Sequence, residues 1–545
     1  MKSLLILKDL DHKFFMTSFV LKKFLEITQN TWKRALKEKR LIDNPSESEL
    51  KRIVEKQPEI KKTRYGNLCT KSEPTSRAER FTKNSIDHSF GKEEIEFLKE
   101  CERTLSQERL ISIDRAVGKK EEGKIVRLTL PLRFAHIAYG GGKLFLRSQK
   151  KTKNPDYEII FFFNENFEKN KMKPFSEKDI TIRIAILPSY KVIKIVKNSS
   201  YIAEFKKGIF CAEDWTVKEK GEGIFLHTSC REDYLKMADG QYKVIRSLIV
   251  ALTGNGKSTL TSKIIAKKER EISWIIQDDG GKVLKDGSFK GYEGGGFYIK
   301  VEKVSPSDNR EIYYGLHYKE SFCENIKVNE KGEFDFFSLK QTPNARAIIP
   351  RNILLHASPH IEVPKIDNFF LIARNPLLPA VAKLNLEQAT ALMTLGQSME
   401  TEAGDPTQAG KMRNVFFYDP FVVGKKAFHA NIFYEIFKNQ PWVNFYLLNT
   451  GEIGEGKKFL DISVKKTTKI LDAILRQKVK KWKKSPTGFE VPEEIKGINS
   501  IFFHPERLYS KSEFEKKQKK LNQVRKECIE KIGERLHPKI KNIFG

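Results

Sequence analysis

Residues 251–260, Ala-Leu-Thr-Gly-Asn-Gly-Lys-Ser-Thr-Leu, join the apolar run at residues 248–250 to a stretch with helical character. A strand that turns through glycines into a Lys-Ser pair is typical of a phosphate-binding loop. Backbone N–H groups and the helix N-terminus hold phosphate oxygens, the lysine reaches the outer phosphates, and the serine hydroxyl contacts Mg²⁺. The usual pattern begins with a glycine where this chain has Ala251. The sequence predicts nucleotide contacts from Thr253, Gly254, Asn255, Gly256, Lys257, Ser258 and Thr259, with an ordinary glycine-rich turn as the alternative.

Two carboxylates follow the next predicted strand along the chain. Residues 274–276, Trp-Ile-Ile, run directly into Gln277, Asp278, Asp279 and Gly280. Because ligands of open α/β sheets collect beyond the carboxyl ends of the strands, the loop and the Asp pair could share a phosphate-bound cation. A plain Asp-Asp-Gly turn is the alternative.

The composition is that of a large, basic chain. Its 545 residues, 39% of them hydrophobic, suffice for large cores and predict two domains. The 100 Lys and Arg against 70 Asp and Glu leave a net charge of +30, which keeps nucleic acid open as a partner. The basic residues are spread along the chain and interleaved with glutamate, however, which favours a solvated surface facing small anionic substrates.

The cysteines and the apolar runs bear on the compartment. Six cysteines, at positions 69, 101, 211, 230, 323 and 528, show no paired spacing, which indicates a reduced, cytoplasmic protein without structural zinc. The short apolar run near the N-terminus is interrupted by Lys8 and Asp9, so neither a signal peptide nor a membrane span is expected.

Hydrophobic periodicity predicts a mixed α/β chain. Ser46 or Ser48 ahead of Glu49 predicts a capped helix over residues 46–54. Apolar runs at 144–146, 159–163 and within 180–196 predict strands, and the glycines at 140–142 break the pattern between them. An amphipathic helix is predicted over 510–536, its apolar face formed by Phe514, Leu521, Val524, Cys528, Ile532 and Leu536.

Two further stretches are weak signals when each is taken alone. Residues 201–207, Tyr-Ile-Ala-Glu-Phe-Lys-Lys, follow a predicted strand, and in so basic a chain a Lys pair usually marks a solvated face. Residues 225–229, Phe-Leu-His-Thr-Ser, place one histidine among apolar residues, where a satisfied core histidine is the commoner explanation.

Read together, these motifs resemble the ATP-dependent phosphoenolpyruvate carboxykinases. The resemblance runs from about residue 144 to 508, in the family's order and approximate spacing, through the motifs at 201–207, 226–229, 251–260, 278–279, 292–296, 344–346 and 448–451. It implies an α/β fold of two domains with the active site in the cleft between them. The mixed α/β substrate-side domain would span 1–222, and the P-loop nucleotide- and metal-binding domain 223–545.

The resemblance also implies metal ligands. Lys207, His227 and Asp279 would bind a transition metal, commonly manganese in this family, and Ser258 with Asp278 would serve the Mg²⁺ of the nucleotide. Histidine and aspartate are ordinary ligands, whereas a lysine ligates only as a neutral amine, which the metal and the neighbouring Lys206 would favour.

Substrate contacts follow from the same resemblance. Tyr201 and Lys206 would lie along the substrate, Arg346 would contact phosphate and substrate, and Arg77 would hold the carboxylate of oxaloacetate. Catalytic roles are expected for Lys206, Lys207, Lys257 and Arg346, and further nucleotide contacts for Ile462 and Thr467.

The chain departs from the family pattern at three places. Gly280 and Gly281 follow the Asp pair where the family has Glu-His-Gly-Trp, and the predicted lid, about 396–412, has its own sequence. Asp461 stands where the family has an arginine that helps to hold the nucleotide. Lys457 or Lys458 could supply the missing charge.

The expected function is therefore a carboxykinase that converts oxaloacetate and ATP reversibly to phosphoenolpyruvate, CO₂ and ADP, with Mg²⁺ and Mn²⁺. A kinase on the same scaffold with another acceptor or phosphate donor, and a non-catalytic nucleic-acid-binding or regulatory protein, are the alternatives. The residues leave open the donor, the physiological direction, the preferred metal and the oligomeric state.

Overall fold

The computed structural model describes residues 2–73, 79–119, 123–149, 152–171, 173, 177–252, 254–268, 270–307, 309–338, 344–400 and 410–544, with backbone only for 2–15 and 79. The chain forms two compact units. The first comprises Met1–Thr216, Tyr292–Ser305 and Tyr313–Ile353, and the second Val217–Gly291, Pro306–Ile312 and Leu354–Gly545. Both contain helices and several sheets, which confirms the predicted mixed α/β class. The functional domains predicted at 1–222 and 223–545 stay a prediction.

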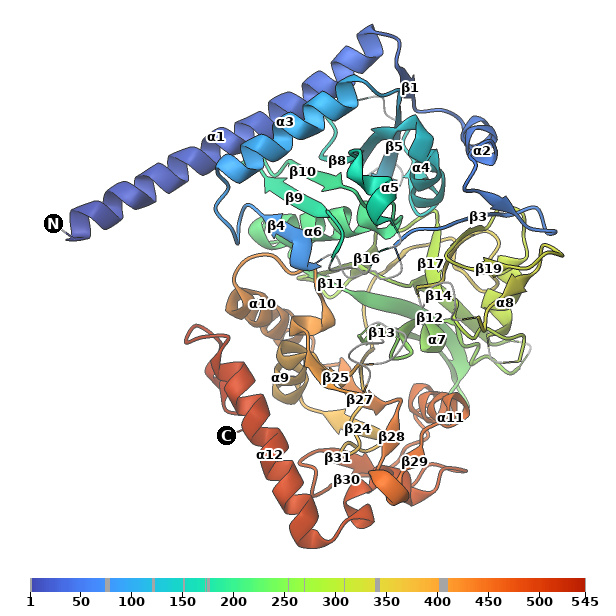
Figure 1. Ribbon diagram of the computed structural model, residues 1–545. Coiled ribbons are helices and arrows are strands. Elements are labelled where there is room, and N and C mark those ends of the chain that lie inside the picture. Colours follow the sequence, from blue (N-terminus) through green and yellow to red (C-terminus); the bar gives the residue numbers. More distant parts are fainter. Residues whose placement is uncertain are drawn as a thin grey trace. The chain divides into compact units, whose positions relative to one another are not determined.

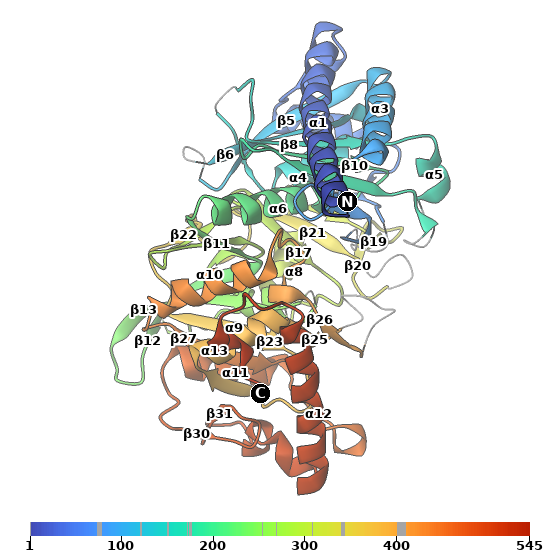
Figure 2. The same cartoon turned by 90° about the vertical axis from the view of Figure 1, so that its left-hand side faces the viewer.

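The first unit is built on an eight-stranded sheet. Its strands run in the order β1 (Leu41–Asp43), β5 (Leu110–Val117), β6 (Lys124–Pro131), β8 (Tyr157–Phe162), β10 (Val192–Lys197), β9 (Thr181–Ile186) and β4 (Thr82–Asn84), with β7 (Leu146–Arg147) paired to β5. Helices α1 (Lys2–Lys37) and α3 (Lys92–Ser106) lie side by side in this unit (Figures 1 and 2). Their buried apolar residues form one core with those of β8, β9 and β10.

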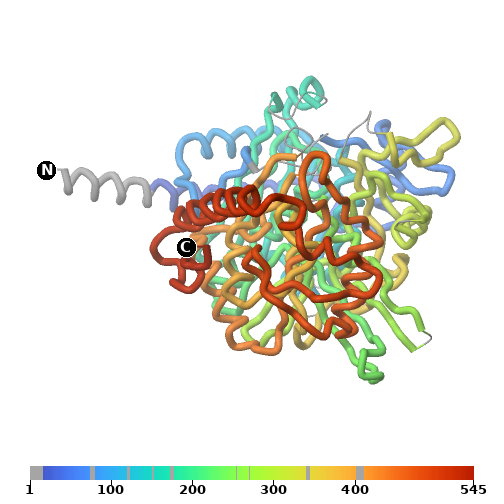
Figure 3. Tube along the Cα trace, turned by 90° about the horizontal axis from the view of Figure 1, so that it is seen from below, coloured from blue at the N-terminus to red at the C-terminus, as the bar shows by residue number. Residues whose placement is uncertain are grey.

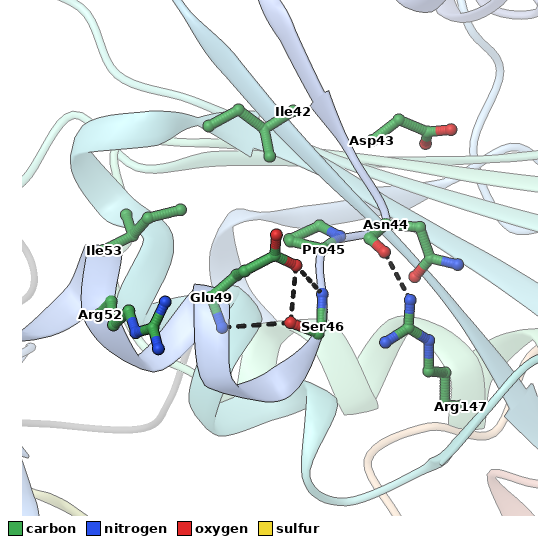
Figure 4. Close-up of a pocket in the computed structure, with 9 residues that line it drawn as sticks. All are labelled: Ile42, Asp43, Asn44, Pro45, Ser46, Glu49, Arg52, Ile53 and Arg147. Carbon is green, nitrogen blue, oxygen red and sulfur yellow. Dashed lines mark hydrogen bonds between the residues drawn. The ribbon is translucent and has the colours of Figure 1, made fainter.

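A capping box begins helix α2 (Glu47–Glu55). The Glu49 backbone N–H donates to Ser46 Oγ at 3.2 Å, and the Ser46 backbone N–H donates to Glu49 Oε2 at 2.8 Å (Figure 4). This confirms Ser46 rather than Ser48 as the N-cap. The same residues line a pocket of about 510 Å³ together with Arg52 and Arg147, and that pocket contains none of the predicted site residues.

A second sheet of the first unit follows the order β17 (Gly296–Lys300), β21 (Arg346–Pro350), β18 (Phe322–Glu324), β3 (Leu68–Thr70) and β2 (Lys61–Lys62). Helix α4 (Ala135–Gly142) packs against it and contains all three glycines that were expected to break the pattern. A Cβ at Gly140 would come within 2.8 Å of Phe322 and 2.9 Å of Ile202, so close packing explains the glycine. The predicted strand at 144–146 was wrong except at Leu146, where β7 begins.

The second unit also centres on an eight-stranded sheet. The order is β14 (Ile272–Gln277), β12 (Thr228–Lys236), β13 (Tyr242–Val250), β23 (Asn368–Ala373), β27 (Asn444–Asn449), β24 (Val381–Leu384), β31 (Glu490–Pro492) and β30 (Trp482–Lys484). Strands β13, β23 and β27 are parallel neighbours, so their carboxyl ends lie at one edge.

Alternate side chains of these parallel strands enter separate cores, as the period of two requires. Leu248 and Phe369 join a core with α9 (Leu386–Leu395) and α10 (Lys426–Lys438). Ile249 and Phe370 join another with α7 (Lys257–Ser262) and α11 (Val464–Leu475). Helices therefore cover both faces of the sheet (Figure 2).

The smaller elements complete the fold. A four-stranded sheet follows the order β11 (Gly223–Leu226), β15 (Gly281–Leu284), β16 (Phe289–Gly291) and β22 (Glu362–Val363). Two-stranded ribbons pair β19 (Lys327–Val328) with β20 (Phe334–Asp335), β25 (Gln397–Met399) with β26 (Met412–Asn414), and β28 (Glu452–Ile453) with β29 (Leu460–Asp461). The remaining α-helices are α5 (Asn166–Asn170), α6 (Ala203–Glu219), α8 (Arg310–Leu316) and α13 (Pro538–Lys541).

Helix α12 (Lys511–Glu530, red in Figure 3) is shorter than predicted. Its predicted apolar face is correct at Phe514 but wrong at Val524, which is 38% exposed, whereas Arg525 is buried. The Arg525 Nε donates to Gln397 Oε1 at 3.0 Å, so a polar partner allows the burial. In the described part of the chain no helix has the length and apolar content to cross a bilayer.

Candidate functional site

The predicted phosphate-binding loop lies at the carboxyl end of β13, as the sequence indicates. Gly254 and Gly256 adopt φ values of +86° and +100°, which glycine accepts at little cost. Asn255 between them is fully buried, and its Oδ1 has no hydrogen-bond donor among the described residues. An orphaned acceptor and glycines with positive φ are features of a loop built to meet a ligand.

The helix that follows the loop is short. Helix α7 has six residues, Lys257–Ser262, so its dipole adds little, and backbone N–H groups and side chains would make the main phosphate contacts. Ser258 and Thr259 are partly exposed at its first turn, whereas Lys257 is buried. Thr253 lies outside the described residues.

The Asp pair after β14 approaches this loop. The Lys257 Nζ donates to the backbone oxygen of Asp278 at 2.8 Å and also bonds the Asp279 carboxylate. The Ser258 Oγ donates to Asp278 Oδ2 at 3.0 Å. The loop lysine and serine therefore meet the two carboxylates directly.

His227, between β11 and β12, completes this cluster. Its Nε2 lies 2.8 Å from Asp279 Oδ1, and its Nδ1 lies 3.1 Å from the backbone oxygen of Tyr418. Both ring nitrogens thus face oxygen acceptors, an arrangement that a second ring proton or a bound cation satisfies. A proton on Nδ1 would leave the Nε2 lone pair for a metal.

This donor set fits a divalent metal in part. The His227 Nε2 and the Asp279 Oδ1, which lie 2.8 Å from each other, are donor types that suit manganese or a similar ion. Ser258 and Asp278 offer the oxygen ligands that Mg²⁺ prefers. The described residues hold no cluster of three or more His, Cys, Asp or Glu side chains. Lys207 stays the predicted further ligand.

In the first unit, three predicted substrate residues surround the ring of Tyr298. The Tyr201 ring centroid lies 6.2 Å from that of Tyr298, the Lys206 Nζ lies 5.3 Å from it, and the Arg346 Cζ lies 5.7 Å from it. A ring face attracts cations, so Tyr298 contacts both of these positive side chains. Burial raises the pKa of Tyr298 well above its usual value, which keeps the phenol neutral.

The two lysines of the 201–207 motif have acidic neighbours. The Lys206 Nζ lies 3.2 Å from Glu293 Oε1, and the Lys207 Nζ lies 2.5 Å from Glu204 Oε1. The Lys194 Nζ contacts the other oxygen of Glu204 at 2.8 Å. Burial alone would raise the pKa of Glu204, but the charges of Lys194 and Lys207 outweigh it and lower that pKa to about 2.

The contact with Glu204 bears on the predicted metal role of Lys207. A carboxylate at this distance stabilises an ammonium group, and only a neutral amine can ligate. Lys206, which was expected to favour the neutral form, is itself directed at Glu293. Coordination by Lys207 therefore requires that the metal itself drive loss of the proton, and the role stays a prediction.

The remaining predicted residues belong to several environments. Ile462 and Thr467 are buried at the start of α11, and Asp461, Lys457 and Lys458 are exposed on the β28–β29 ribbon. Arg77 and most of the predicted lid, residues 401–409, lie outside the described residues.

Sequence reasoning missed the residues that support the substrate group. Tyr298, Glu204 and Glu293 are buried neighbours of the predicted lysines. Their only signal in the sequence was position, since Glu204 lies within the 201–207 motif, Glu293 within the motif at 292–296, and Tyr298 just after it.

Comparisons with known proteins identify the family of this chain. The chain matches the family model described as phosphoenolpyruvate carboxykinase over residues 39–501. It is 27% identical, over 325 residues, to the phosphoenolpyruvate carboxykinase (ATP) of Aeropyrum pernix, and the match covers 58% of this chain and 63% of that relative. The chain thus spans less than two thirds of the length of this curated relative. Because the family model matches most of the chain, the resemblance is confirmed: the chain belongs to the phosphoenolpyruvate carboxykinase family.

Proposed function

We propose that this protein is an ATP-dependent phosphoenolpyruvate carboxykinase. It would decarboxylate oxaloacetate and transfer the γ-phosphoryl group of ATP to the resulting enolate, giving phosphoenolpyruvate, CO₂ and ADP reversibly. The observation that carries the proposal is the cluster of Lys257, Ser258, His227 and Asp279 in a member of this family. A protein without phosphoryl transfer has no physical need for all four together.

The nucleotide would be held by the second unit. In this proposal the loop at 254–259 binds the phosphates, and Lys257 neutralises charge on the phosphoryl group as it is transferred. The Lys257 Nζ now contacts the Asp279 carboxylate, so an arriving phosphate would compete with that carboxylate for the amine. Ile462 and Thr467 are the proposed contacts toward the nucleoside.

Two cations are part of the proposal. His227 and Asp279, with Lys207, would hold the transition metal, and Ser258 with Asp278 the Mg²⁺ of the nucleotide. Bound divalent ions stabilise negative charge on enolate and phosphate oxygens. The imidazole is oriented for this by the Tyr418 carbonyl, because a proton on Nδ1 leaves Nε2 to face Asp279.

The first unit would supply the substrate side. Lys206 and Arg346, both near the ring of Tyr298, offer positive charge for the carboxylates of oxaloacetate, and Arg346 can form bidentate contacts. The Arg346 Nε donates to Asn344 Oδ1 at 3.1 Å, which orients the guanidinium. The predicted cleft between the domains, the role of Arg77 and a lid at 396–412 belong to the same proposal.

A coupled assay in both directions tests the proposal. Oxaloacetate would be supplied with ATP, GTP or pyrophosphate, in Mg²⁺ with and without Mn²⁺. We expect turnover with ATP that falls at least about 100-fold in Asp279→Asn, because a metal and phosphate partner is lost. Asp286→Asn is the matched control, because Asp286 is an exposed turn residue of the same unit whose carboxylate accepts hydrogen bonds from Ser288.

Other outcomes identify the alternatives. Bound ATP without turnover of oxaloacetate in either direction would indicate a kinase with a different acceptor, and turnover with pyrophosphate alone a different donor. Tight, steeply salt-dependent binding to DNA or RNA without turnover would support a nucleic-acid-binding protein. A cytoplasmic location stays a prediction.

A further inference from the structure

Arg374 immediately follows strand β23, between the two strands that lead to the nucleotide motifs. On one side β13 pairs with β23 and leads into the phosphate-binding loop. On the other side β27 pairs with β23 through Asn449 and leads into Thr450 and Gly451. In a parallel sheet of this kind, residues beyond the carboxyl ends of neighbouring strands face the ligand.

Hydrogen bonds tie the backbone of Arg374 to the loop. Its N–H donates to Ser398 Oγ at 2.8 Å, and the Asn255 side chain donates to that same hydroxyl oxygen. The Thr450 Oγ1, which follows β27, donates to the Asn255 carbonyl at 2.8 Å, so the loop is also bonded to the segment after that strand. Arg374 is therefore positioned by the same contacts that hold the centre of the loop.

The side chain of Arg374 lies against Gly451. A Cβ at Gly451 would come within 3.2 Å of Arg374 Cγ and 3.3 Å of its Cβ and Cδ, closer than ordinary contact. The glycine thus leaves room for the aliphatic part of the arginine to run along the backbone. The motif at 448–451 has a packing role that its sequence does not reveal.

The guanidinium lacks partners in the part of the chain that the structure describes. Its Nε is buried without a hydrogen-bond acceptor. Burial lowers the pKa of Arg374, and the charges of Glu452 and Asp461 counteract this effect only in part. Buried polar groups of native proteins are almost always bonded, so a partly buried arginine in this state indicates a missing ligand.

The two nearby carboxylates indicate which part of a nucleotide this ligand is. Glu452 and Asp461 would repel a polyphosphate, which Lys257 already serves at the other end of the loop. Ribose hydroxyls can donate to carboxylates, and a planar guanidinium stacks on a nucleobase. The surroundings of Arg374 therefore suit the nucleoside better than the phosphates.

We propose that Arg374 binds the nucleoside part of the nucleotide, stacking its guanidinium on the base and donating a hydrogen bond to an acceptor of the base or ribose, and so supplies the cationic contact that Asp461 cannot make. The inference rests on the proposed function, since it assumes that a nucleotide occupies the loop. It differs from the expectation that Lys457 or Lys458 supplies the charge, because both of these lie exposed on the β28–β29 ribbon.

Equilibrium binding to the full chain tests this assignment. Isothermal titration would compare ATP with inorganic tripolyphosphate for the wild type, Arg374→Ala, Arg374→Met and the control Arg535→Ala, which changes an exposed arginine of the same unit. Loss of stacking on one base should weaken ATP binding about tenfold or more in both Arg374 variants. We expect tripolyphosphate affinity to stay within about twofold in every variant, because its contacts lie at the other end of the loop.

Two variants separate a lost contact from a folding defect. Arg374→Met retains the aliphatic stem, so it guards against a folding defect in Arg374→Ala, and Gly451→Ala should reproduce the loss for ATP by displacing that stem. An equal loss for ATP and tripolyphosphate would overturn the inference in favour of a phosphate contact. Unchanged ATP affinity in Arg374→Met, with the wild type active in the carboxykinase assay, overturns the inference alone. A wild type that binds no ATP overturns the proposed function with it.

Discussion

Glu324, the last residue of β18, is buried beside the ring that the predicted substrate residues surround. Its Oε1 accepts from the Ile202 backbone N–H at 3.1 Å, and its Oε2 accepts from the Tyr298 hydroxyl. Burial raises the pKa of Glu324 to about 7, because these hydrogen bonds offset only part of the lost hydration and the charge of Glu73 adds to the rise. The carboxyl should therefore ionise near neutral pH.

The raised pKa predicts a pH-dependent stability of definite sign. The folded chain holds this proton more tightly than the unfolded chain, in which the pKa of Glu324 is the ordinary 4.5. The stabilisation is complete below about pH 4.5 and is lost as the pH rises through about 7. Between about pH 5 and pH 8, at about 1.4 kcal/mol for each pH unit, the loss comes to about 2.5 kcal/mol.

Glu324→Gln should remove this dependence. Glutamine keeps an acceptor for Ile202 and cannot ionise. As the pH rises from about 5 to about 8, the free energy of unfolding of the variant should therefore improve by about 2.5 kcal/mol relative to that of the wild type. Urea unfolding, resolved by hydrogen-exchange mass spectrometry of peptides from β17, β18 and β21, gives the free energy of the unit concerned. Groups common to both proteins cancel in the comparison.

Two results would contradict the raised pKa of Glu324. A relative change below about 1 kcal/mol would mean that Glu324 ionises at an ordinary pH and that burial does not control it. A change of the opposite sign would mean that the carboxylate, not the acid, is the form held in the folded chain. Glu73→Gln should also reduce the pH dependence, because burial raises the pKa of Glu73 itself and its charge adds to the rise at Glu324.

Three more substitutions test separate features of the fold. Glu204→Gln should lower stability by about 3 kcal/mol, because two lysines lose their buried partner. In urea titrations at decreasing pH, the decline in stability between about pH 4.5 and 2 should be smaller in the variant than in the wild type, because the Glu204 carboxylate no longer takes up its proton there. Gly396→Ala should lower the free energy of unfolding, measured by thermal unfolding, by about 3 kcal/mol or more, because the new Cβ would lie 1.5 Å from a backbone oxygen and the residue has a φ of +52°. Gly240→Ala is the control: this glycine also has a positive φ but faces open space, so the loss should be about 1 kcal/mol. Ser46→Ala should cost about 1 kcal/mol and speed amide exchange in the first turn of α2, and an equal effect of Ser48→Ala would contradict the capping box.

Structural features that depend on residues close together in the sequence were predictable. The strand before the loop at 251–260, the carboxylates after β14 and the cap at Ser46 each depend on residues a few positions apart, and the structure has all three. Helix α12 shows the limit of periodicity, because its pattern continued past the point where the helix ends. The buried Arg525 on that helix depends on Gln397, a partner that helical spacing cannot report.

The mixed α/β class, the loop with its Asp pair, and the family could all be predicted from the sequence. The contacts of Tyr298 with Tyr201, Lys206 and Arg346, and the position of Arg374 along Gly451, are visible only in the folded chain. The difference lies in the range of the forces involved. Backbone dihedral preferences and the alternation of apolar side chains act between near neighbours in the chain, so a local pattern reports them. Burial of charges and of ring faces joins residues up to about a hundred positions apart, and the cost of burying each depends on partners that only the folded chain supplies.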